Sequence, residues 1–325
     1  MILDEVKKLL GADWQAVLDT VRRSLESDIP LLNRTNASLL SKGGKQIRPA
    51  VTLLCARICG DAVSETAIRY AAAVELLHNA TLLHDDVADE ADTRRGLPTV
   101  RALMGPSASV LIGDFWLVRA LHNLFGGDRE TEAIRLASLT LQDLAEGEML
   151  QLQRAEQCDT DEADYLRIID CKTASLFVTA ARLAALSADA APEQTEAVAS
   201  YALFLGRAFQ IRDDILDYTG DGGFGKPLGV DLREHKMTLP LLGALSRVDP
   251  AEALRIRARV RDFSGDAREE ASLRAFVLEH GGIPYAQEHL ERDTQKAVAA
   301  LSVFPDGEDR RALEEIARFT GRRTV

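Results

Sequence analysis

The sequence predicts an all-α protein, and three observations support this fold class. No proline occurs between Pro49 and Pro98 or between Pro106 and Pro192, and proline is the residue that most disfavours a helix interior. These intervals are rich in Ala, Leu, Arg and Glu, which are good helix formers. Apolar residues recur three and four positions apart, and no alternation with period two lasts for a strand's length. We therefore expect long helices throughout.

The connections between these helices are expected to be short. The expected loops contain glycine, serine or aspartate and cover residues 41–45, 126–128 and 220–229. One helix is expected to begin near Asp159, because an acidic residue followed three positions later by Glu162 is typical of a helix N-terminus. No linker rich in serine or proline divides the chain. We therefore expect a single domain over residues 1–325.

The composition excludes several classes of function. The 325 residues include 51 acidic and 39 basic side chains, which gives a formal net charge of −12. This charge argues against nucleic acid or an anionic membrane surface as the main partner. The N-terminus does not resemble a signal peptide, and no apolar stretch is long enough for a transmembrane helix. We therefore expect no integral membrane segment. The four cysteines lack the spacing of a zinc site, so we expect free thiols and a cytoplasmic protein.

Two aspartate clusters with the same spacing are the main functional signal. Each is a DDxxD motif with aspartates at positions i, i+1 and i+4, namely Asp85, Asp86 and Asp89 in HDDVADE, and Asp213, Asp214 and Asp217 in RDDILDY. Positions i and i+4 of a helix share a face, and like charges placed together are costly unless a cation neutralises them. Mg²⁺ prefers carboxylates, water and substrate phosphates. One such cluster would more often be a solvated acidic face, but two copies beside apolar residues favour a paired magnesium site.

A diphosphate held by carboxylate-bound magnesium would also need cationic donors, and several basic residues are candidates for this role. These candidates are Lys45 and Arg48 in GGKQIRP, Arg94 and Arg95 after the first cluster, and Lys172, Lys226 and Lys236 further along the chain. Glycines allow the backbone to approach a ligand closely, and lysine and arginine side chains bind phosphate oxygens. Each of these residues taken alone is more often simple surface charge.

Together these motifs resemble those of the trans-isoprenyl diphosphate synthase family, the polyprenyl synthetases. The matching segments are GGKQIRP (43–49), ELLHNATLLHDDVADEADTRRG (75–96), GDFWLVRA (113–120), KTASLF (172–177) and FQIRDDILDYTGDGGFGKPLGVDLREHKMTLP (209–240). The resemblance therefore spans nearly the whole chain. It implies an orthogonal bundle of long helices around a deep central cavity, usually assembled as a homodimer.

The resemblance also implies a role for each matching residue. Asp85, Asp89 and Asp213 would bind Mg²⁺, with three ions present when substrate is bound, and Asp86, Asp214 and Asp217 would bind it directly or orient its ligands. Isopentenyl diphosphate would be held by Lys45, Arg48, His78 and Arg95. The allylic diphosphate would be held by Arg94, Lys172, Thr173, Gln210, Lys226 and Lys236, of which Lys172 and Lys236 also act in catalysis. His84 is expected to be structural.

The implied reaction is a head-to-tail (1′-4) condensation that lengthens an all-trans prenyl chain. Magnesium and the cationic side chains stabilise charge as diphosphate leaves the allylic substrate. The double bond of isopentenyl diphosphate attacks the resulting carbocation, and a proton is then lost to the released diphosphate. Water must be excluded from such an intermediate, and the loop 219–229 that carries Lys226 is the expected lid.

Three other functions compete with this interpretation. A terpene cyclase also ionises allylic diphosphates, but the second DDxxD and the isopentenyl diphosphate residues argue against it. A non-catalytic subunit of a heteromeric synthase would be expected to lose motif residues, whereas both clusters are complete here. A Mg²⁺-dependent phosphohydrolase would need a positioned general base, and the sequence offers no distinct one.

Product length can be argued from helix geometry. The growing chain is expected to run along the helix that carries Asp85, past Thr81, Ala80 and Leu77, which lie one and two turns towards the N-terminus. Thr81 and Ala80 are too small to block the pocket. We therefore expect a product longer than farnesyl diphosphate. Because Leu77 is larger, a geranylgeranyl or even farnesyl product is the alternative.

Overall fold

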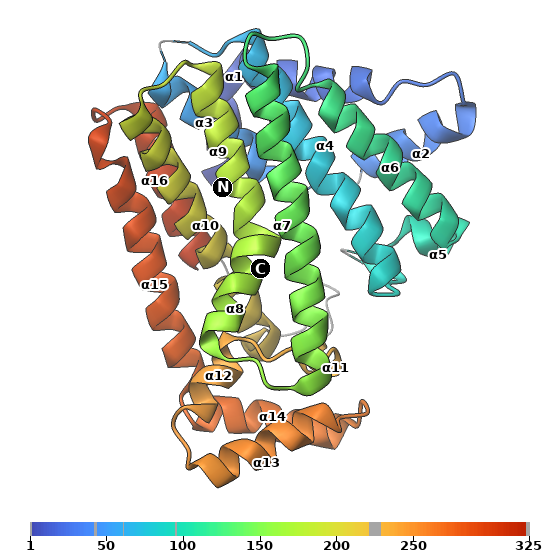
Figure 1. Ribbon diagram of the computed structural model, residues 1–325, viewed down its shortest axis with the longest axis vertical. Coiled ribbons are helices and arrows are strands. Elements are labelled where there is room, and N and C mark those ends of the chain that lie inside the picture. The colour runs from blue at the N-terminus through green and yellow to red at the C-terminus, as the bar shows by residue number, and fades with distance from the viewer. Residues whose placement is uncertain (1, 42–43, 61, 95, 221–228, 323–325) are drawn as a thin grey trace. The chain divides into compact units, whose positions relative to one another are not determined.

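The computed structural model describes residues 2–41, 44–60, 62–94, 96–220 and 229–322 (Figure 1). Nearly all regular structure in these residues is helical, which confirms the predicted all-α class. The helices are α1 (Ile2–Ser24), α2 (Pro30–Ser41), α3 (Ile47–Cys59), α4 (Glu65–Ala88), α5 (Val100–Met104), α6 (Pro106–His122), α7 (Glu130–Gln157), α8 (Glu162–Ile169), α9 (Ser175–Ser187), α10 (Pro192–Thr219), α11 (Val230–Arg233), α12 (Leu239–Leu245), α13 (Pro250–Arg261), α14 (Ala267–Glu279), α15 (Gly282–Ala300) and α16 (Glu308–Arg322).

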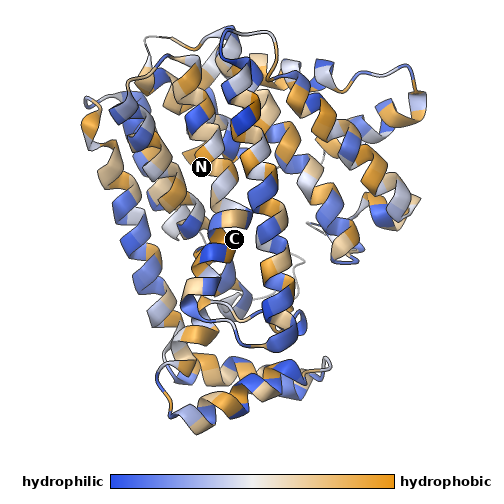
Figure 2. Cartoon of the chain, viewed as in Figure 1, coloured by the Kyte–Doolittle hydropathy of each residue, from blue (hydrophilic) through white to orange (hydrophobic). Residues whose placement is uncertain are grey.

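Four short elements complete the described structure. Strands β1 (Thr93–Arg94) and β2 (Leu97–Pro98) pair antiparallel just after α4. A π-helical turn, η1 (Asp170–Ala174), lies between α8 and α9, and a 3₁₀ turn, η2 (Leu301–Val303), follows α15. The helices carry hydrophobic and hydrophilic residues together (Figure 2), as expected for helices with one buried face. None of the described helices is both long and apolar enough to span a bilayer.

The chain divides into two compact units, and the first comprises residues 1–139, 176–200 and 300–316. Its core contains α3 and most of α4, whose apolar residues are largely buried. The N-terminus of α4 is capped by Ser64, whose hydroxyl accepts the backbone N–H of Ala67. At its other end the backbone N–H of Asp89 donates to the carbonyl of Asp85 at 2.8 Å. The first aspartate cluster thus lies on the last turn and the C-cap of α4.

The second unit comprises residues 140–175, 201–299 and 317–325. Its core packs α8, the second half of α10 and all seven residues of α12 against α13, α14 and α15. Helix α8 starts at Glu162, and its N-cap is Asp161, not the expected Asp159. The reason is a reciprocal pair of hydrogen bonds, in which Asp161 and Asp164 each accept the other's backbone N–H.

Candidate active site

The first aspartate cluster combines one buried and two more accessible carboxylates. Asp86 is only 4% exposed and accepts a 2.7 Å hydrogen bond from Nε of Arg94 in strand β1. The β1–β2 hairpin therefore returns the chain to α4 and places a guanidinium against this carboxylate. Asp85 is half-buried and Asp89 is exposed. These two are the aspartates of this cluster that a ligand could reach.

Two residues predicted to bind isopentenyl diphosphate lie together in the same unit. Nη1 of Arg48, in α3, is 3.2 Å from Nε2 of His78, in α4. The Arg48 guanidinium also lies over the ring of Phe177, 4.4 Å from its centroid. The aromatic face and the imidazole hold the arginine in one orientation. The structure thus joins residues from three of the motifs, at positions 48, 78 and 177.

The second aspartate cluster is organised around the buried carboxylate of Asp214. It accepts a 2.6 Å hydrogen bond from the hydroxyl of Tyr165 and a 2.8 Å hydrogen bond from Nε2 of Gln210. Burial, and then the neighbouring Asp214, raise the pKa of Tyr165 well above its ordinary value. The tyrosine therefore remains a proton donor to this carboxylate. Asp213, next to it on α10, is only half-buried.

The π-helical turn η1 brings two predicted substrate residues beside this cluster. The hydroxyl of Thr173 donates a 2.8 Å hydrogen bond to Oε1 of Gln210, which itself donates to Asp214. Lys172 forms an ion pair with Glu148 of α7. A continuous line of hydrogen bonds thus connects the KTASLF motif to the second DDxxD motif.

The third aspartate of the second cluster has a different environment. Asp217 is 8% exposed, and its two oxygens accept the backbone N–H groups of Val230 and Asp231, each at 3.2 Å. Asp217 therefore satisfies two backbone N–H groups in the first turn of α11 and ties this helix to α10. Nearby in sequence, Lys236 forms an ion pair with Glu234.

Three predicted site residues are exposed or lie outside the described residues. Lys45 is exposed, and Arg95 and Lys226 lie outside the described residues, as does most of the predicted lid at 219–229. The ring of His84 packs on Gly113 of α6, and its Nε2 lies 3.2 Å from Asp114, which fits the expected structural role.

The carboxylates fit the chemistry of a magnesium site. Asp86, Asp214 and Asp217 are buried and accept hydrogen bonds from protein donors, whereas Asp85 and Asp213 are half-buried and Asp89 is exposed. A hard cation that keeps waters and substrate oxygens needs only one or two carboxylates per ion. The described residues contain no ready cluster of three or more His, Cys, Asp or Glu ligands. The metal assignment of Asp85, Asp89 and Asp213 therefore remains a prediction.

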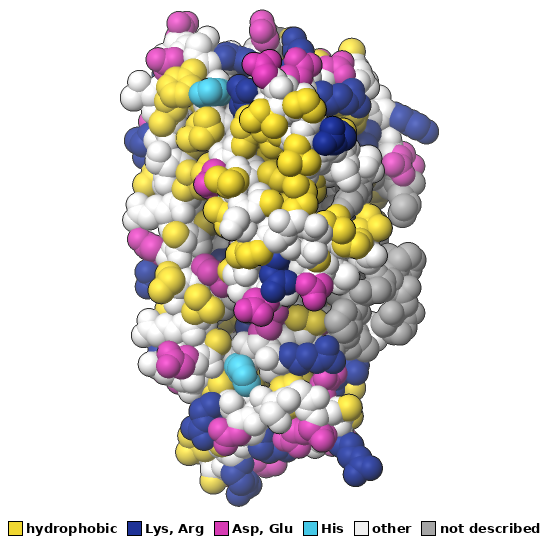
Figure 3. All heavy atoms as spheres, turned by 90° about the vertical axis from the view of Figure 1, so that its right-hand side faces the viewer, with side chains coloured by type: hydrophobic (Ala, Val, Ile, Leu, Met, Phe, Trp, Pro, Cys, Tyr) yellow, Lys and Arg dark blue, Asp and Glu magenta, His cyan; other side chains and the backbone are white. Residues whose placement is uncertain are grey.

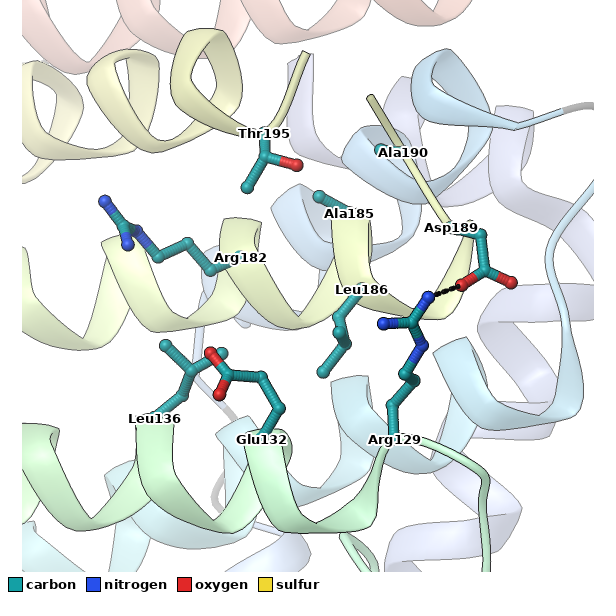
Figure 4. A pocket seen from close by; sticks show the side chains of 9 residues that line it. All are labelled: Arg129, Glu132, Leu136, Arg182, Ala185, Leu186, Asp189, Ala190 and Thr195. Carbon is teal, nitrogen blue, oxygen red and sulfur yellow. Dashed lines mark hydrogen bonds and ion pairs between the residues drawn. The ribbon is translucent and has the colours of Figure 1, made fainter. Parts of the chain in front are cut away.

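Two cavities lie in the first unit. One, of about 160 Å³, borders the first cluster and is lined by Gln46, Glu75, Asn79, Asp86 and Arg94 together with apolar residues. The other, of about 150 Å³, opens among α7, α9 and α10, beside the 2.7 Å ion pair of Arg129 with Asp189 (Figure 4). It contains none of the predicted site residues.

The predicted chain-length residues lie on another stripe of α4 from the residues that line the first cavity. Ala80 and Leu77 are 1% and 3% exposed, and Thr81 is half-buried with its hydroxyl bonded to the carbonyl of His78. Neither described cavity includes these three residues. Their role in product length therefore stays a prediction.

Sequence reasoning missed several residues that organise the site. Tyr165 lies 49 positions before its partner Asp214, so no local spacing signals the contact. Arg207 makes two 2.6 Å hydrogen bonds to Asp170, the first residue of η1. Glu148, the partner of Lys172, is one of several acidic residues of the long helix α7, and nothing in its spacing sets it apart. Arg207 lies only six positions before Asp213, but its partner Asp170 is 37 positions away, so no local spacing signals this contact either.

The fold and the site together define a class of protein: an all-α enzyme with two DDxxD clusters and adjacent cationic and hydroxyl groups suited to diphosphates. Comparisons with known proteins agree with this class. Residues 29–276 match the polyprenyl synthetase family. The chain is 38% identical to the octaprenyl diphosphate synthase of Escherichia coli strain K12 over 324 residues, which are 99% of both chains.

Two solved structures are similar over nearly their whole length. The polyprenyl synthase of Caulobacter crescentus, solved with calcium and isoprenyl diphosphate, has a TM-score of 0.90 and 37% identity, covering 99% of this chain and 98% of that one. The decaprenyl diphosphate synthase of Rhodobacter capsulatus has a TM-score of 0.91 and 34% identity, covering 99% of each chain. The chain therefore belongs to the polyprenyl synthetase family and is a prenyltransferase.

Proposed function

We propose that this protein is an all-trans polyprenyl diphosphate synthase that adds isopentenyl diphosphate to an allylic diphosphate and makes a product longer than farnesyl diphosphate. The observation that carries the proposal is the pair of DDxxD helices, each with a buried carboxylate held by a protein donor beside a more accessible one. Relatives named octaprenyl and decaprenyl diphosphate synthases support a long product, about eight to ten isoprene units.

The side chains can be given roles in this reaction. Mg²⁺, when held by Asp85, Asp89 and Asp213, would supply positive charge that stabilises the departing diphosphate; we propose three ions. Lys172, Thr173 and Gln210 would bind the allylic diphosphate, with Arg94, Lys226 and Lys236. Lys45, Arg48, His78 and Arg95 would bind isopentenyl diphosphate.

The bond changes balance without a protein nucleophile. The bond between C1 of the allylic substrate and the diphosphate oxygen breaks, and the diphosphate keeps the electron pair. The double bond of isopentenyl diphosphate then forms the new carbon–carbon bond, and one proton is lost to the released diphosphate. The protein's contribution is to bind and orient both substrates and to exclude water.

We propose that the two units act as one polyprenyl synthetase domain over residues 1–325, because the family match runs through residues of both. We also place the enzyme in the cytoplasm, where its four free cysteines would stay reduced.

We further propose that the enzyme is a homodimer. Helices α5 and α6 carry large exposed hydrophobic side chains, namely Leu103, Met104, Val110, Leu111 and Val118. Hydrophobic side chains gather on the upper part of the face shown in Figure 3. Exposed apolar side chains gathered on one face are typical of a protein interface, and a closed symmetric dimer would cover them. Light scattering should give a molar mass twice that of one chain, and the substitution Leu111→Glu should lower the measured mass towards that of a monomer.

Product analysis tests the proposed activity. The purified chain is incubated with farnesyl diphosphate, radiolabelled isopentenyl diphosphate and MgCl₂, and the products are dephosphorylated and separated by reversed-phase chromatography. We expect labelled all-trans alcohols longer than farnesol. A hydrocarbon formed without label would indicate a cyclase, and no activity of the chain alone would indicate a subunit of a heteromeric synthase.

A further inference from the structure

The π-helical turn η1 is the most unusual stretch of backbone near the site. A π turn has one more residue per hydrogen-bonded ring than an α-helix, and it occurs mostly as a short insertion at functional sites. Here it spans Asp170–Ala174 and carries Lys172 and Thr173. Something in the surrounding structure must favour this turn over regular α-helix.

Two buried glycines lie directly against this turn, one on each of two long helices. At Gly206 of α10, an added Cβ would lie 2.5 Å from Cα and 2.7 Å from Cβ of Ala174. At Gly147 of α7, it would lie 2.6 Å from Cβ of Cys171 and 3.0 Å from Cγ of Lys172. Both helices therefore approach η1 more closely than any residue with a side chain would allow.

Backbone conformation does not explain these glycines. Neither Gly147 nor Gly206 has a positive φ, so the freedom of glycine to adopt left-handed conformations is not used. Glycine is also unfavourable in the interior of a helix. Each helix interior nevertheless contains a glycine at its contact with η1, and close packing is the feature that both positions share.

The turn is connected to the second aspartate cluster by direct hydrogen bonds. Thr173 donates to Gln210 at 2.8 Å, and Gln210 donates to Asp214 at 2.8 Å. Lys172, the residue before Thr173, is paired with Glu148 on the same helix as Gly147. A displacement of η1 would therefore move the lysine and threonine and disturb the hydrogen bonds to Asp214 at the same time.

We infer that Gly147 and Gly206 are positioning residues, which hold the π turn so that Lys172 and Thr173 are aligned for the allylic diphosphate. This inference rests on the proposed function, since it concerns one of the two substrates of that reaction. Neither glycine is expected to touch the substrate. An alanine at either position would push η1 away from its helix, and misplacement by about 1 Å can cost on the order of a hundredfold in rate.

The test compares Gly147→Ala and Gly206→Ala with the control Gly307→Ala, where an added Cβ would meet no atom within 4 Å. Steady-state rates are measured with farnesyl and isopentenyl diphosphates, and farnesyl diphosphate binding in MgCl₂ is measured by calorimetry. We expect KM and Kd for farnesyl diphosphate to rise by about tenfold or more in both variants. KM for isopentenyl diphosphate should stay within about twofold, and the control should match wild type.

Hydrogen exchange of the segment 165–180 provides a readout that does not depend on activity. Faster exchange there in both variants, together with the selective loss of farnesyl diphosphate affinity, would support the inference. Unchanged exchange, unchanged affinity in folded Gly147→Ala, or equal losses for both substrates would overturn it. Loss of the fold in both variants would overturn it as well, because the glycines would then serve folding. Wild-type protein that incorporates no isopentenyl diphosphate would instead refute the proposed function, while exchange and calorimetry would still decide the role of the glycines.

Discussion

The hydrogen bond from Tyr165 to Asp214 should contribute measurably to stability. The donor is 4% exposed, the acceptor is equally buried, and the two oxygens are 2.6 Å apart. Tyr165→Phe removes only the hydroxyl and leaves the apolar ring in place. The carboxylate of Asp214 would then lose one of the two side-chain donors described above and keep the other, Gln210. Little other packing should change.

The expected loss can be estimated from the type of hydrogen bond. A hydrogen bond to a charged group contributes about 1.5–3 kcal/mol net, because a buried acceptor left without its donor cannot recover water. We therefore expect Tyr165→Phe to lower the free energy of unfolding by about 2 kcal/mol. The matched control is Tyr70→Phe. Tyr70 is 1% exposed, and its hydroxyl has no hydrogen-bond partner in the described part of the chain. Removing that hydroxyl should cost little or should stabilise the protein.

The assay is urea unfolding of both variants and wild type, followed by far-UV circular dichroism, with the midpoints compared at equal slope. Tyr165→Phe should unfold at clearly lower urea than Tyr70→Phe. Equal midpoints for the two variants would refute the reasoning, because the hydroxyl of Tyr165 would then contribute no more to stability than the hydroxyl of Tyr70.

The remaining predictions concern metal, substrates and pH. Asp85→Ala or Asp213→Ala should reduce turnover by orders of magnitude with the circular dichroism spectrum unchanged, because each removes a predicted Mg²⁺ ligand; a near-normal rate in saturating Mg²⁺ would contradict this. Arg48→Ala should mainly raise KM for isopentenyl diphosphate, and Lys236→Ala mainly that for the allylic substrate; equal losses in both would argue against separate sites. The raised pKa of Tyr165 means that the folded state holds this proton more tightly than the unfolded state. Its contribution is therefore fully present below about pH 10 and is lost as pH rises further, so wild type should lose more stability than Tyr165→Phe in alkaline urea titrations.

The helices and the aspartate clusters were readable from sequence because their signals are local. Helix-forming composition and proline spacing predict the long helices, and the i, i+1, i+4 pattern places Asp85 and Asp89 together at the C-terminal end of α4, where Asp89 is the C-cap. Burial within a cluster was not readable in the same way. The pattern indicates no difference in burial between Asp85 and Asp86. In the structure, Asp86 is buried and bonded to Arg94, whereas Asp85 is half-buried.

Contacts between distant segments were the part that could not be predicted. Tyr165 reads as an ordinary apolar position of an amphipathic helix, and only the packing of α8 against α10 makes it a donor to Asp214. The π turn at Asp170–Ala174, which overlaps the start of KTASLF, could not be predicted either, since its five residues include no proline or glycine. The two glycines that approach it lie 23 or more positions away from it in sequence, so only the folded chain reveals the contact.

Product length is the prediction that most directly joins helix geometry to function. Ala80 is five residues before Asp85, about 7.5 Å along the helix axis, and is buried at 1% exposure. If a growing prenyl chain passes this point, Ala80→Phe should fill that path and shift the products towards farnesyl diphosphate. In that case stability should be retained, because the phenylalanine ring would occupy space that the growing prenyl chain otherwise uses. The control is Ala71→Phe on the opposite face of α4, where the residue is fully buried and overpacking should cost about 1–3 kcal/mol without shortening the product. Chromatography of dephosphorylated products and urea midpoints measure both effects. A stable Ala80→Phe enzyme with wild-type products would show that Ala80 does not line the path of the chain. An Ala80→Phe variant as destabilised as Ala71→Phe would show that Ala80 belongs to the packed core.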